Sequence, residues 1–266
     1  MAESQDGWIE LQDLIDDQLK LQIEIAFTRH HEFMVRHGLN GCRSVLDLGT
    51  GNGAFLRRLA ESEPKIQFIG VDKREALLDL AREKAPANTA WHLLDAEATV
   101  ARLDYAKVDG VLMRYFLLHI PNARQLLQAW IKKLKPGTKI WIIDVDLSKF
   151  ECQPMHPAFE KLATLVQDFC SVHSVDTNAG QKLGDLLADL GCKSVEFEAD
   201  PFASDNTEPQ ALAKFLRQEA MLYACLLEKP SDWVDLTEIS SFINSEVVIG
   251  RCRVSYGMVC WSATVG

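Results

Sequence analysis

The chain has 266 residues, of which 47% are hydrophobic and 25% are charged, as is usual for a globular protein. Its net charge of −10 at pH 7 gives no basic footprint for nucleic acid, and no apolar run approaches the roughly 20 residues that span a bilayer. We therefore expect no nucleic-acid partner and no membrane partner. The length suits one large α/β domain with insertions, or a domain with a small cap.

The first seven residues contain no basic region followed by an apolar run, so we expect no signal peptide and a cytoplasmic location. The seven cysteines are scattered and include no CxxC pair. This pattern predicts buried small hydrophobic side chains rather than disulfides or a structural zinc site.

Over the first forty residues, apolar positions recur at helix-like spacing, which predicts an N-terminal helical segment. Apolar runs and amphipathic stretches then alternate. Strands are predicted at about 43–48, 66–72, 89–94, 107–113 and 138–146. Helices are predicted at about 53–62, 74–85 and 121–135, with a poorly defined stretch near 97–104. This alternation requires a parallel sheet with helices on both faces.

The alternation ends after Asp146. Helices are predicted at about 156–173, 179–191, 208–228 and 232–244. One strand is predicted at 192–199, and a last strand near 252–264 has the composition of a strand that closes a sheet.

The most informative segment runs from Val45 to Phe55, where a buried strand leads into Gly49, Gly51 and Gly53. Glycines at alternate positions let the backbone turn sharply and approach a ligand where a Cβ would clash. The helix that follows offers unpaired N–H groups and a positive dipole end. We therefore predict a nucleotide-like cofactor at this turn.

The turn could bind a dinucleotide, because Gly49-x-Gly51-x-x-Ala54 fits the dinucleotide fingerprint. It could instead bind S-adenosylmethionine (SAM). Asp47 favours SAM, since a carboxylate repels a pyrophosphate but attracts the sulfonium and ammonium of SAM. A short-chain dehydrogenase would also carry a Tyr-x-x-x-Lys pair, and no tyrosine here is followed four positions later by lysine.

The string Asp47-Leu-Gly-Thr-Gly-Asn-Gly53 resembles the first motif of class I SAM-dependent methyltransferases of the small-molecule type. The resemblance covers roughly residues 40–200. It implies an α/β fold with a doubly wound, mostly parallel seven-stranded sheet, whose final strand runs antiparallel between its two neighbours. It also implies SAM as the cofactor, with Asp47, Gly49, Thr50 and Gly51 in its site.

The same resemblance implies that the helical segments form a lid over the substrate. We expect residues 1–40 to be an N-terminal lid segment. Residues 41–266 would form the SAM-binding domain, with helical insertions near 150–175 and 205–245.

Acidic residues end the second and third predicted strands. Asp72 lies 19 positions after Gly53, which matches an acid that binds ribose hydroxyls, although such an acid can also cap a helix. Lys73 would lie near the adenine edge. By resemblance, Asp95 and Ala96 contact adenine, and the alternative for Asp95 is again a helix cap.

The fourth predicted strand continues into Met113-Arg-Tyr-Phe-Leu-Leu-His119 and looks like the fourth motif of the family. By resemblance, Met113 and Arg114 border the methionine part of SAM, while Arg114 could instead form a surface ion pair. His119 is a candidate general base, but a His-x-Pro element near a helix start is more often structural.

Three further groups of residues could take part in binding or catalysis. Asp144 and Asp146 could bind a divalent metal, but the sequence shows no convincing additional ligands, so we predict a metal-independent enzyme. From the N-terminal helix, Arg29, His30 and His31 could reach the cofactor carboxylate, but a histidine pair on a helix is more often a solvated or partly packed surface. Candidate bases in the lid are His156, His173 and Tyr223.

The sequence thus predicts a SAM-dependent methyltransferase that acts on a small organic acceptor, in specialised or cofactor biosynthesis. Two alternatives stay open. One is a methyltransferase-like protein that binds SAM without transferring methyl, as a scaffold or for other chemistry. The other is a protein methyltransferase, which would show an acceptor motif such as Asn-Pro-Pro-Tyr after the fourth strand. A homodimer is one candidate assembly.

Overall fold

The computed structural model describes residues 5–120, 122–173, 175–176, 179–228 and 236–266. The predicted helix starts at 121 and 232 lie outside these residues. The chain divides into two compact units. The sheet unit comprises Phe27–Asp146, Asn178–Asp200 and Met258–Gly266, and the helical unit comprises Met1–Ala26, Leu147–Thr177 and Pro201–Gly257.

The sheet unit contains the predicted alternation of strands and helices. Its strands are β1 (Ser44–Leu48), β2 (Gln67–Asp72), β3 (Thr89–Leu93), β4 (Gly110–Arg114), β5 (Lys139–Val145), β7 (Lys193–Ala199) and β10 (Met258–Thr264). Its helices are the end of α1 (Gln5–Arg36), α2 (Ala54–Ser62), α3 (Glu75–Glu83), α4 (Ala96–Arg102), α5 (Ala123–Ile131) and α7 (Ala179–Asp189). Short 3-10 turns occupy Leu39–Gly41, Tyr105–Lys107 and Leu117–His119.

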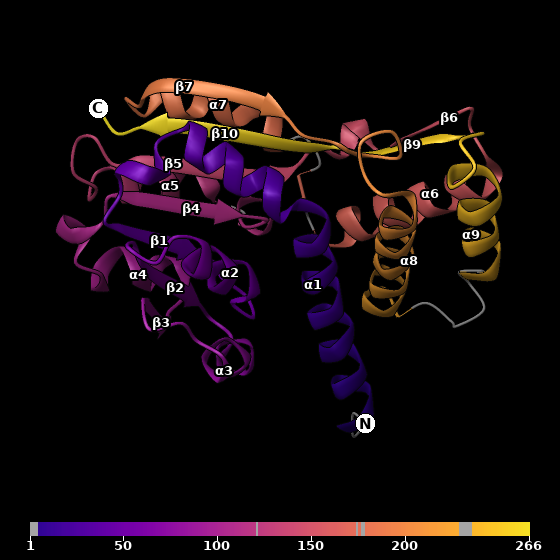
Figure 1. The fold of residues 1–266 in the computed structure, drawn as a ribbon, viewed down its shortest axis with the longest axis horizontal. Helices are drawn as coiled ribbons and strands as arrows, with labels where there is room; N and C mark the ends of the chain where they lie inside the picture. Colours follow the sequence, from indigo (N-terminus) through magenta and orange to yellow (C-terminus); the bar gives the residue numbers. More distant parts are fainter. Residues whose placement is uncertain (1–4, 121, 174, 177–178, 229–235) are drawn as a thin grey trace. The chain divides into compact units, whose positions relative to one another are not determined.

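These seven strands form one sheet in the order β3-β2-β1-β4-β5-β10-β7 (Figure 1). The strands from β3 to β5 pair in parallel, whereas β10 pairs antiparallel with both β5 and β7. The order reverses at β1, so β1 and β4 flank the point where ligands bind in doubly wound sheets. The predicted seven-stranded, mostly parallel fold with an inserted antiparallel strand is confirmed.

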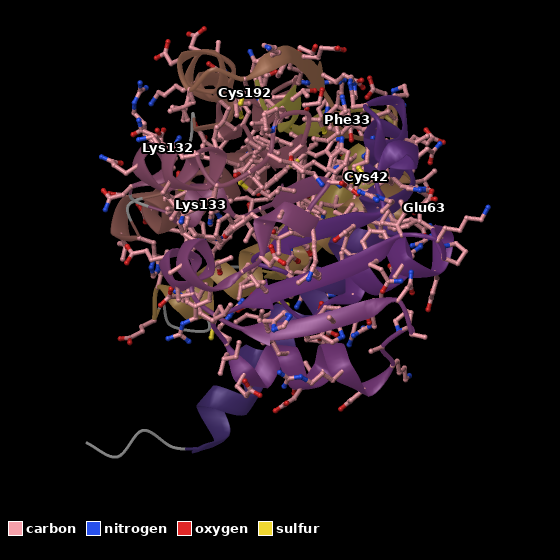
Figure 2. All side chains as sticks on the ribbon, turned by 90° about the vertical axis from the view of Figure 1, so that its left-hand side faces the viewer. Phe33, Cys42, Glu63, Lys132, Lys133 and Cys192 are labelled. Carbon is pink, nitrogen blue, oxygen red and sulfur yellow. The ribbon has the colours of Figure 1, made fainter. Side chains whose placement is uncertain are left out.

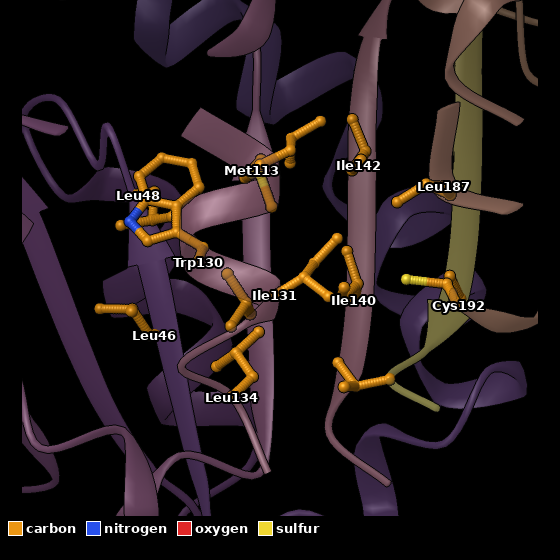
Figure 3. Packing of buried hydrophobic residues seen from close by; sticks show 14 of the residues in the cluster. Leu46, Leu48, Met113, Trp130, Ile131, Leu134, Ile140, Ile142, Leu187 and Cys192 are labelled. Carbon is orange, nitrogen blue, oxygen red and sulfur yellow. The ribbon is translucent and has the colours of Figure 1, made fainter. Parts of the chain in front are cut away.

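One face of the sheet is covered by α5 and α7. Trp130 and Ile131 of α5 belong to the same buried cluster as Leu46 and Met113 of the sheet (Figure 3). Leu187 of α7 and Ile140 and Ile142 of β5 extend this cluster. Because side chains alternate along a strand, the residues between these, among them Asp47 and Arg114, point to the opposite face.

The helical unit has helices and a small sheet of its own. Its helices, besides the start of α1, are α6 (Pro157–Val172), α8 (Pro209–Leu226) and α9 (Leu236–Phe242), which is followed by a π-helix at Ile243–Val247. A 3-10 turn lies at Leu147–Lys149. The strands β6 (Glu151–Gln153), β8 (Phe202–Ala203) and β9 (Arg253–Tyr256) pair antiparallel in the order β6-β9-β8.

The prediction of a single last strand at 252–264 is wrong in one respect. The run is divided at Gly257 into β9, which pairs in the small sheet, and β10, which pairs in the large one. The β-rich composition reports a preference for extended backbone, but it does not identify the partner strand. The small sheet therefore had no separate signal in the sequence.

Six of the seven cysteines are buried, as predicted, and one is not. All seven are free thiols, and Cys225 is exposed while the other six are buried. Cys42 and Cys192 are two of the buried ones, whereas Lys132 and Lys133, just after α5, are exposed (Figure 2). In the described part of the chain, the helices are too short or too polar to cross a bilayer.

Alanine substitutions at Gly53 and Gly137 distinguish two ways in which an added methyl group lowers stability, namely backbone strain and steric clash. Both have positive φ, at 67° and 88°. A Cβ at Gly53 would lie 2.6 Å from atoms of Ala81 and Trp91, whereas a Cβ at Gly137 would meet nothing within 4 Å. We expect Gly137→Ala to destabilise by about 1 kcal/mol, through backbone strain alone, and Gly53→Ala by at least about 1 kcal/mol more. Urea denaturation measures both, and equal losses would contradict the close packing at Gly53.

Candidate functional site

The glycine-rich turn joins β1 to α2 and adopts the conformation predicted for it. Gly49, Gly51 and Gly53 have φ angles of 75°, 58° and 67°, in the left-handed region that favours glycine. A Cβ at Gly49 would lie 2.3 Å from the Phe116 ring. The turn thus needs glycine both for its backbone angles and for the close approach of the loop after β4.

Hydrogen bonds attach this turn to the end of β2. The N–H groups of Gly49 and Thr50 both donate to the Val71 carbonyl at 2.9 Å. The N–H of Gly51 donates to Asp72 Oδ2 at 2.9 Å, and Asp72 Oδ1 accepts from the N–H of Arg74 at 3.0 Å. Asp72 therefore organises the turn. The N-cap position of α3 belongs to Arg74, so Asp72 is not the helix cap.

Asp47 is a buried carboxyl immediately before the turn, with 4% of its surface exposed. Burial raises its pKa to about 6, and the Asp72 charge adds to this, while the Thr50 hydroxyl and the Arg114 guanidinium act in the opposite direction. A cation bound beside Asp47 would favour its charged form.

Arg114 ends β4 and is also buried, with 9% of its surface exposed. Its guanidinium carbon lies 4.7 Å from the centre of the Phe55 ring and 4.4 Å from that of Tyr115. Its Nε donates to His30 Nδ1 at 3.4 Å, and in the described part of the chain its buried Nη2 has no hydrogen-bond partner. This burial excludes the surface ion pair considered for Arg114. A buried guanidinium stays charged and needs acceptors, so Nη2 could bind an anionic group.

The loop after β4 is strained and firmly held. Tyr115 has a φ of 51°, which is uncommon for a residue other than glycine, and its N–H donates to the Ile143 carbonyl at 2.8 Å. The Asp144 carboxylate accepts from the N–H of Leu118 at 3.2 Å and from that of Val145 at 2.9 Å. Burial raises the pKa of Asp144 to about 7, against these backbone hydrogen bonds.

Asp144 and Asp146 thus have separate structural partners. Asp146 Oδ2 accepts from Gln181 Nε2 at 2.9 Å. Among the described residues, the one group of three or more histidine, cysteine or acidic side chains close enough to share a metal is His30, Asp200 and Cys260. The carboxylates of the fifth strand do not belong to it.

The residues predicted to contact adenine lie at the start of α4. Asp95 is exposed and caps this helix, because its carboxylate accepts from the N–H of Ala98 at 2.5 Å. Ala96 is the first helical residue and is partly buried, and Lys73 after β2 is exposed. The cap found here is the alternative considered for Asp95, and contacts with adenine stay a prediction.

Met113 is buried next to Arg114 in β4, within the cluster under α5. His119 is exposed at the end of the 3-10 turn that follows, and its N–H donates to the Phe116 carbonyl at 3.1 Å. Catalysis by His119 stays a prediction.

The end of α1 contributes three residues to the sheet unit. His30 is completely buried, and its Nε2 lies 3.6 Å from Asp200 Oδ2. Arg29 Nη1 lies 3.3 Å from Asp200 Oδ1, while His31 Nε2 lies 2.8 Å from Glu63 Oε1. Sequence reasoning missed Asp200, because it follows β7 and lies 170 positions after His30, with no motif to connect them.

The helical unit contains the three candidate bases. His156 caps α6 through a hydrogen bond from the Ala158 N–H to its Nδ1, which is a structural role, and His173 is exposed. Tyr223 faces Glu219, a buried carboxyl that accepts from Gln18 Nε2. Burial raises the pKa of Glu219 to about 7. Burial and the neighbouring Glu219 hold the pKa of Tyr223 well above its ordinary value, so the Tyr223 phenol stays protonated near neutral pH.

A family model described as "Methyltransferase domain" matches residues 40–202. The trans-aconitate 2-methyltransferase of Mycobacterium tuberculosis is 28% identical over 182 residues, which cover 64% of this chain and 66% of that protein. The demethylmenaquinone methyltransferase of Deinococcus radiodurans is 32% identical over 104 residues, which cover 38% of this chain and 43% of that protein. This chain thus spans less than two thirds of the length of these two curated relatives.

Among solved structures, the phosphoethanolamine N-methyltransferase 2 of Haemonchus contortus, in complex with S-adenosyl-L-methionine, superposes with a TM-score of 0.51. It is 20% identical, and the match covers 84% of this chain and 48% of that one. At this identity the likeness shows a shared fold.

The buried Asp144 carboxyl makes a prediction about pH. Its pKa is higher in the folded chain than in the unfolded one, so its contribution to stability is complete below pH 4 and is lost as the pH rises through about 7. Asp144→Asn has no such charge. Between pH 4.5 and 8, we expect the free energy of unfolding of this variant to rise by on the order of 3 kcal/mol relative to the wild type. Urea denaturation at both pH values measures the difference in unfolding free energy between Asp144→Asn and the wild type. A difference that does not change with pH would refute the raised pKa of Asp144.

Proposed function

Because the chain belongs to the family of class I SAM-dependent methyltransferases, we propose that it transfers the methyl group of SAM to a small organic acceptor, in specialised or cofactor biosynthesis. The family, the enzyme class and the cofactor that the sequence predicted are confirmed by the match over residues 40–202. The placement of the cofactor, the acceptor and the roles of individual residues are our proposal.

The observation that supports the cofactor site best is a pair of opposite buried charges beside the glycine turn. Asp47 and Arg114 attract one another, and both are more than nine-tenths buried. The amino-acid end of SAM carries an ammonium and a carboxylate, next to a positive sulfonium. Asp47 suits the positive groups, and the partnerless Nη2 of Arg114 suits the carboxylate. A diphosphate carries no positive group that would use Asp47.

The other site residues follow the turn and the strand ends. We assign the backbone of Gly49, Thr50 and Gly51, together with Met113, to the methionine part of SAM. The ribose hydroxyls are assigned to Asp72, because its carboxylate already organises the turn from the end of β2. We assign the adenine to Asp95 and Ala96, with Lys73 at its edge.

When bound, SAM supplies an electrophilic methyl group on a positively charged sulfur. The chain's own contribution is alignment, because the attacking atom must approach the methyl carbon in line with the departing sulfur. The fixed turn, the strained loop after β4 and the Asp144 hydrogen bonds hold the donor side in one geometry.

The names of the curated relatives support a small acceptor. They name trans-aconitate and demethylmenaquinone, which are both small organic molecules. Residues 115–120 also contain no Asn-Pro-Pro-Tyr motif of the kind expected for a protein methyltransferase. We further propose a cytoplasmic location without nucleic-acid or membrane partners, and a homodimer as the candidate assembly.

Asp72 provides a direct test of the cofactor site. Asp72→Ala removes both the proposed ribose acceptor and the acceptor for the Gly51 N–H, so we expect binding of S-adenosylhomocysteine to weaken by about 1–3 kcal/mol. The matched control is Asp79→Ala, which removes an exposed carboxylate from α3 and should leave the affinity unchanged. Isothermal titration calorimetry measures both, and an unchanged affinity for Asp72→Ala would remove this residue from the site.

The methyl-transfer proposal is tested with SAM labelled in its methyl group, incubated with the protein and a metabolite extract. We expect the label in a low-molecular-weight product. Label in a protein fraction would favour a protein methyltransferase instead. Tight binding of SAM with no labelled product from any extract would favour the alternative of SAM binding without transfer.

A further inference from the structure

His30 lies in the middle of a chain of buried polar contacts within the sheet unit. Its Nδ1 accepts from Arg114 Nε at 3.4 Å, and its Nε2 lies 3.6 Å from Asp200 Oδ2. Arg29 approaches the other oxygen of Asp200 at 3.3 Å. The Arg114 charge in turn attracts the Asp47 carboxylate, which immediately precedes the glycine turn. None of the sequence motifs of the site includes His30 or Asp200.

The donor on Arg114 determines the protonation of the imidazole. A guanidinium in a protein is always protonated, so its Nε carries a hydrogen and can only donate. His30 Nδ1 must then keep its lone pair. In a neutral imidazole the single proton therefore lies on Nε2, which is the nitrogen that faces the Asp200 carboxylate.

The charged groups around His30 favour this neutral form. Burial lowers the pKa of His30, and the positive charges of Arg114 on β4 and Arg29 on α1 lower it further. Asp200, after β7, is the acidic group that faces the ring, and the Cys260 thiol of β10 lies in the same cluster. The Phe55 ring of α2 covers another side, with 6.3 Å between the ring centres.

A metal ion is the obvious alternative for this cluster, since ligand atoms of His30, Asp200 and Cys260 lie within 4.8 Å of one another. Two contacts argue against it. Arg29 already neutralises Asp200, and the proton on Nε2 leaves His30 without a lone pair on that side. Two neighbouring guanidinium groups would also repel a cation.

We propose that His30 is a positioning residue, which as a neutral imidazole with its proton on Nε2 holds the Arg114 guanidinium in the orientation that binds the carboxylate of the cofactor. The Asp200 carboxylate faces Nε2 at 3.6 Å, so its negative charge favours the proton on that nitrogen and supports the same geometry. The identity of the ligand rests on the proposed function. The protonation state and the contact with Arg114 are properties of the chain alone.

Three variants of His30 test the contact of Nδ1 with Arg114 separately from the approach of Nε2 to Asp200. His30→Asn places a carbonyl oxygen near the former Nδ1 and keeps an acceptor for Arg114, whereas His30→Gln offers its amide toward Asp200. His30→Leu removes both contacts. We expect S-adenosylhomocysteine to bind about tenfold more weakly to the Leu and Gln variants, and His30→Asn to recover most of the affinity.

The probe 5′-methylthioadenosine lacks the amino-acid end of the cofactor and provides the control for general damage. Its affinity should be the same in wild type and all three variants. An equal loss for both ligands would mean that His30 only supports the fold, and failure of His30→Asn to recover affinity would also overturn the proposal. If wild type binds neither ligand, the proposed function fails instead.

A measurement on the unliganded wild type tests the tautomer even if the variants do not fold. Long-range ¹H–¹⁵N NMR spectra of the histidine rings distinguish the two neutral tautomers and the charged form. We expect His30 to carry its proton on Nε2 from pH 6 to 8. A proton on Nδ1, a charged ring in this range, or a zinc ion retained in stoichiometric amount by the purified protein would each refute the proposal.

Discussion

The bend between β1 and α2 depends on hydrogen bonds from its own backbone to the end of β2. Two N–H groups share the Val71 carbonyl, and that of Gly51 reaches the Asp72 carboxylate. These bonds fix a run of positive φ angles that side chains rarely tolerate. Because β1 lies at the point where the strand order reverses, the same bend defines where a ligand can lie against the sheet.

A second constraint is electrostatic and comes from two buried charges, those of Asp47 and Arg114. Asp47 and Arg114 come from adjacent strands and face the side of the sheet opposite the Trp130 cluster. Burying two charges is costly unless each has partners, and here the arginine also lies over two aromatic rings and donates to a histidine. The arrangement leaves one donor of Arg114 without an acceptor among the described residues. We interpret this as a site prepared for a ligand that carries both signs of charge, which is how the amino-acid end of SAM differs from a diphosphate.

The parts that could be predicted from the sequence depend on neighbours along the chain. Hydrophobic runs predicted the strands, and the Asp47-to-Gly53 motif predicted the turn, because both are local patterns. Asp144 shows the limit: as one of two nearby carboxylates it resembled a metal ligand, but it holds the backbone at Leu118. His30 and Asp200 could not be connected in advance, since only the folded sheet brings α1 and the end of β7 together. The division of the last strand at Gly257 depends in the same way on distant partners.

We propose that the cofactor lies against the bend after β1 and contacts its backbone. Amide ¹H–¹⁵N spectra of the labelled protein, recorded during titration with S-adenosylhomocysteine and separately with NAD⁺, detect such binding at single residues. We expect S-adenosylhomocysteine to shift the amide signals of Gly49, Gly51 and Gly53, and NAD⁺ to leave them unchanged. Shifts of these signals by NAD⁺ alone, or shifts by S-adenosylhomocysteine confined to residues far from this bend, would contradict it.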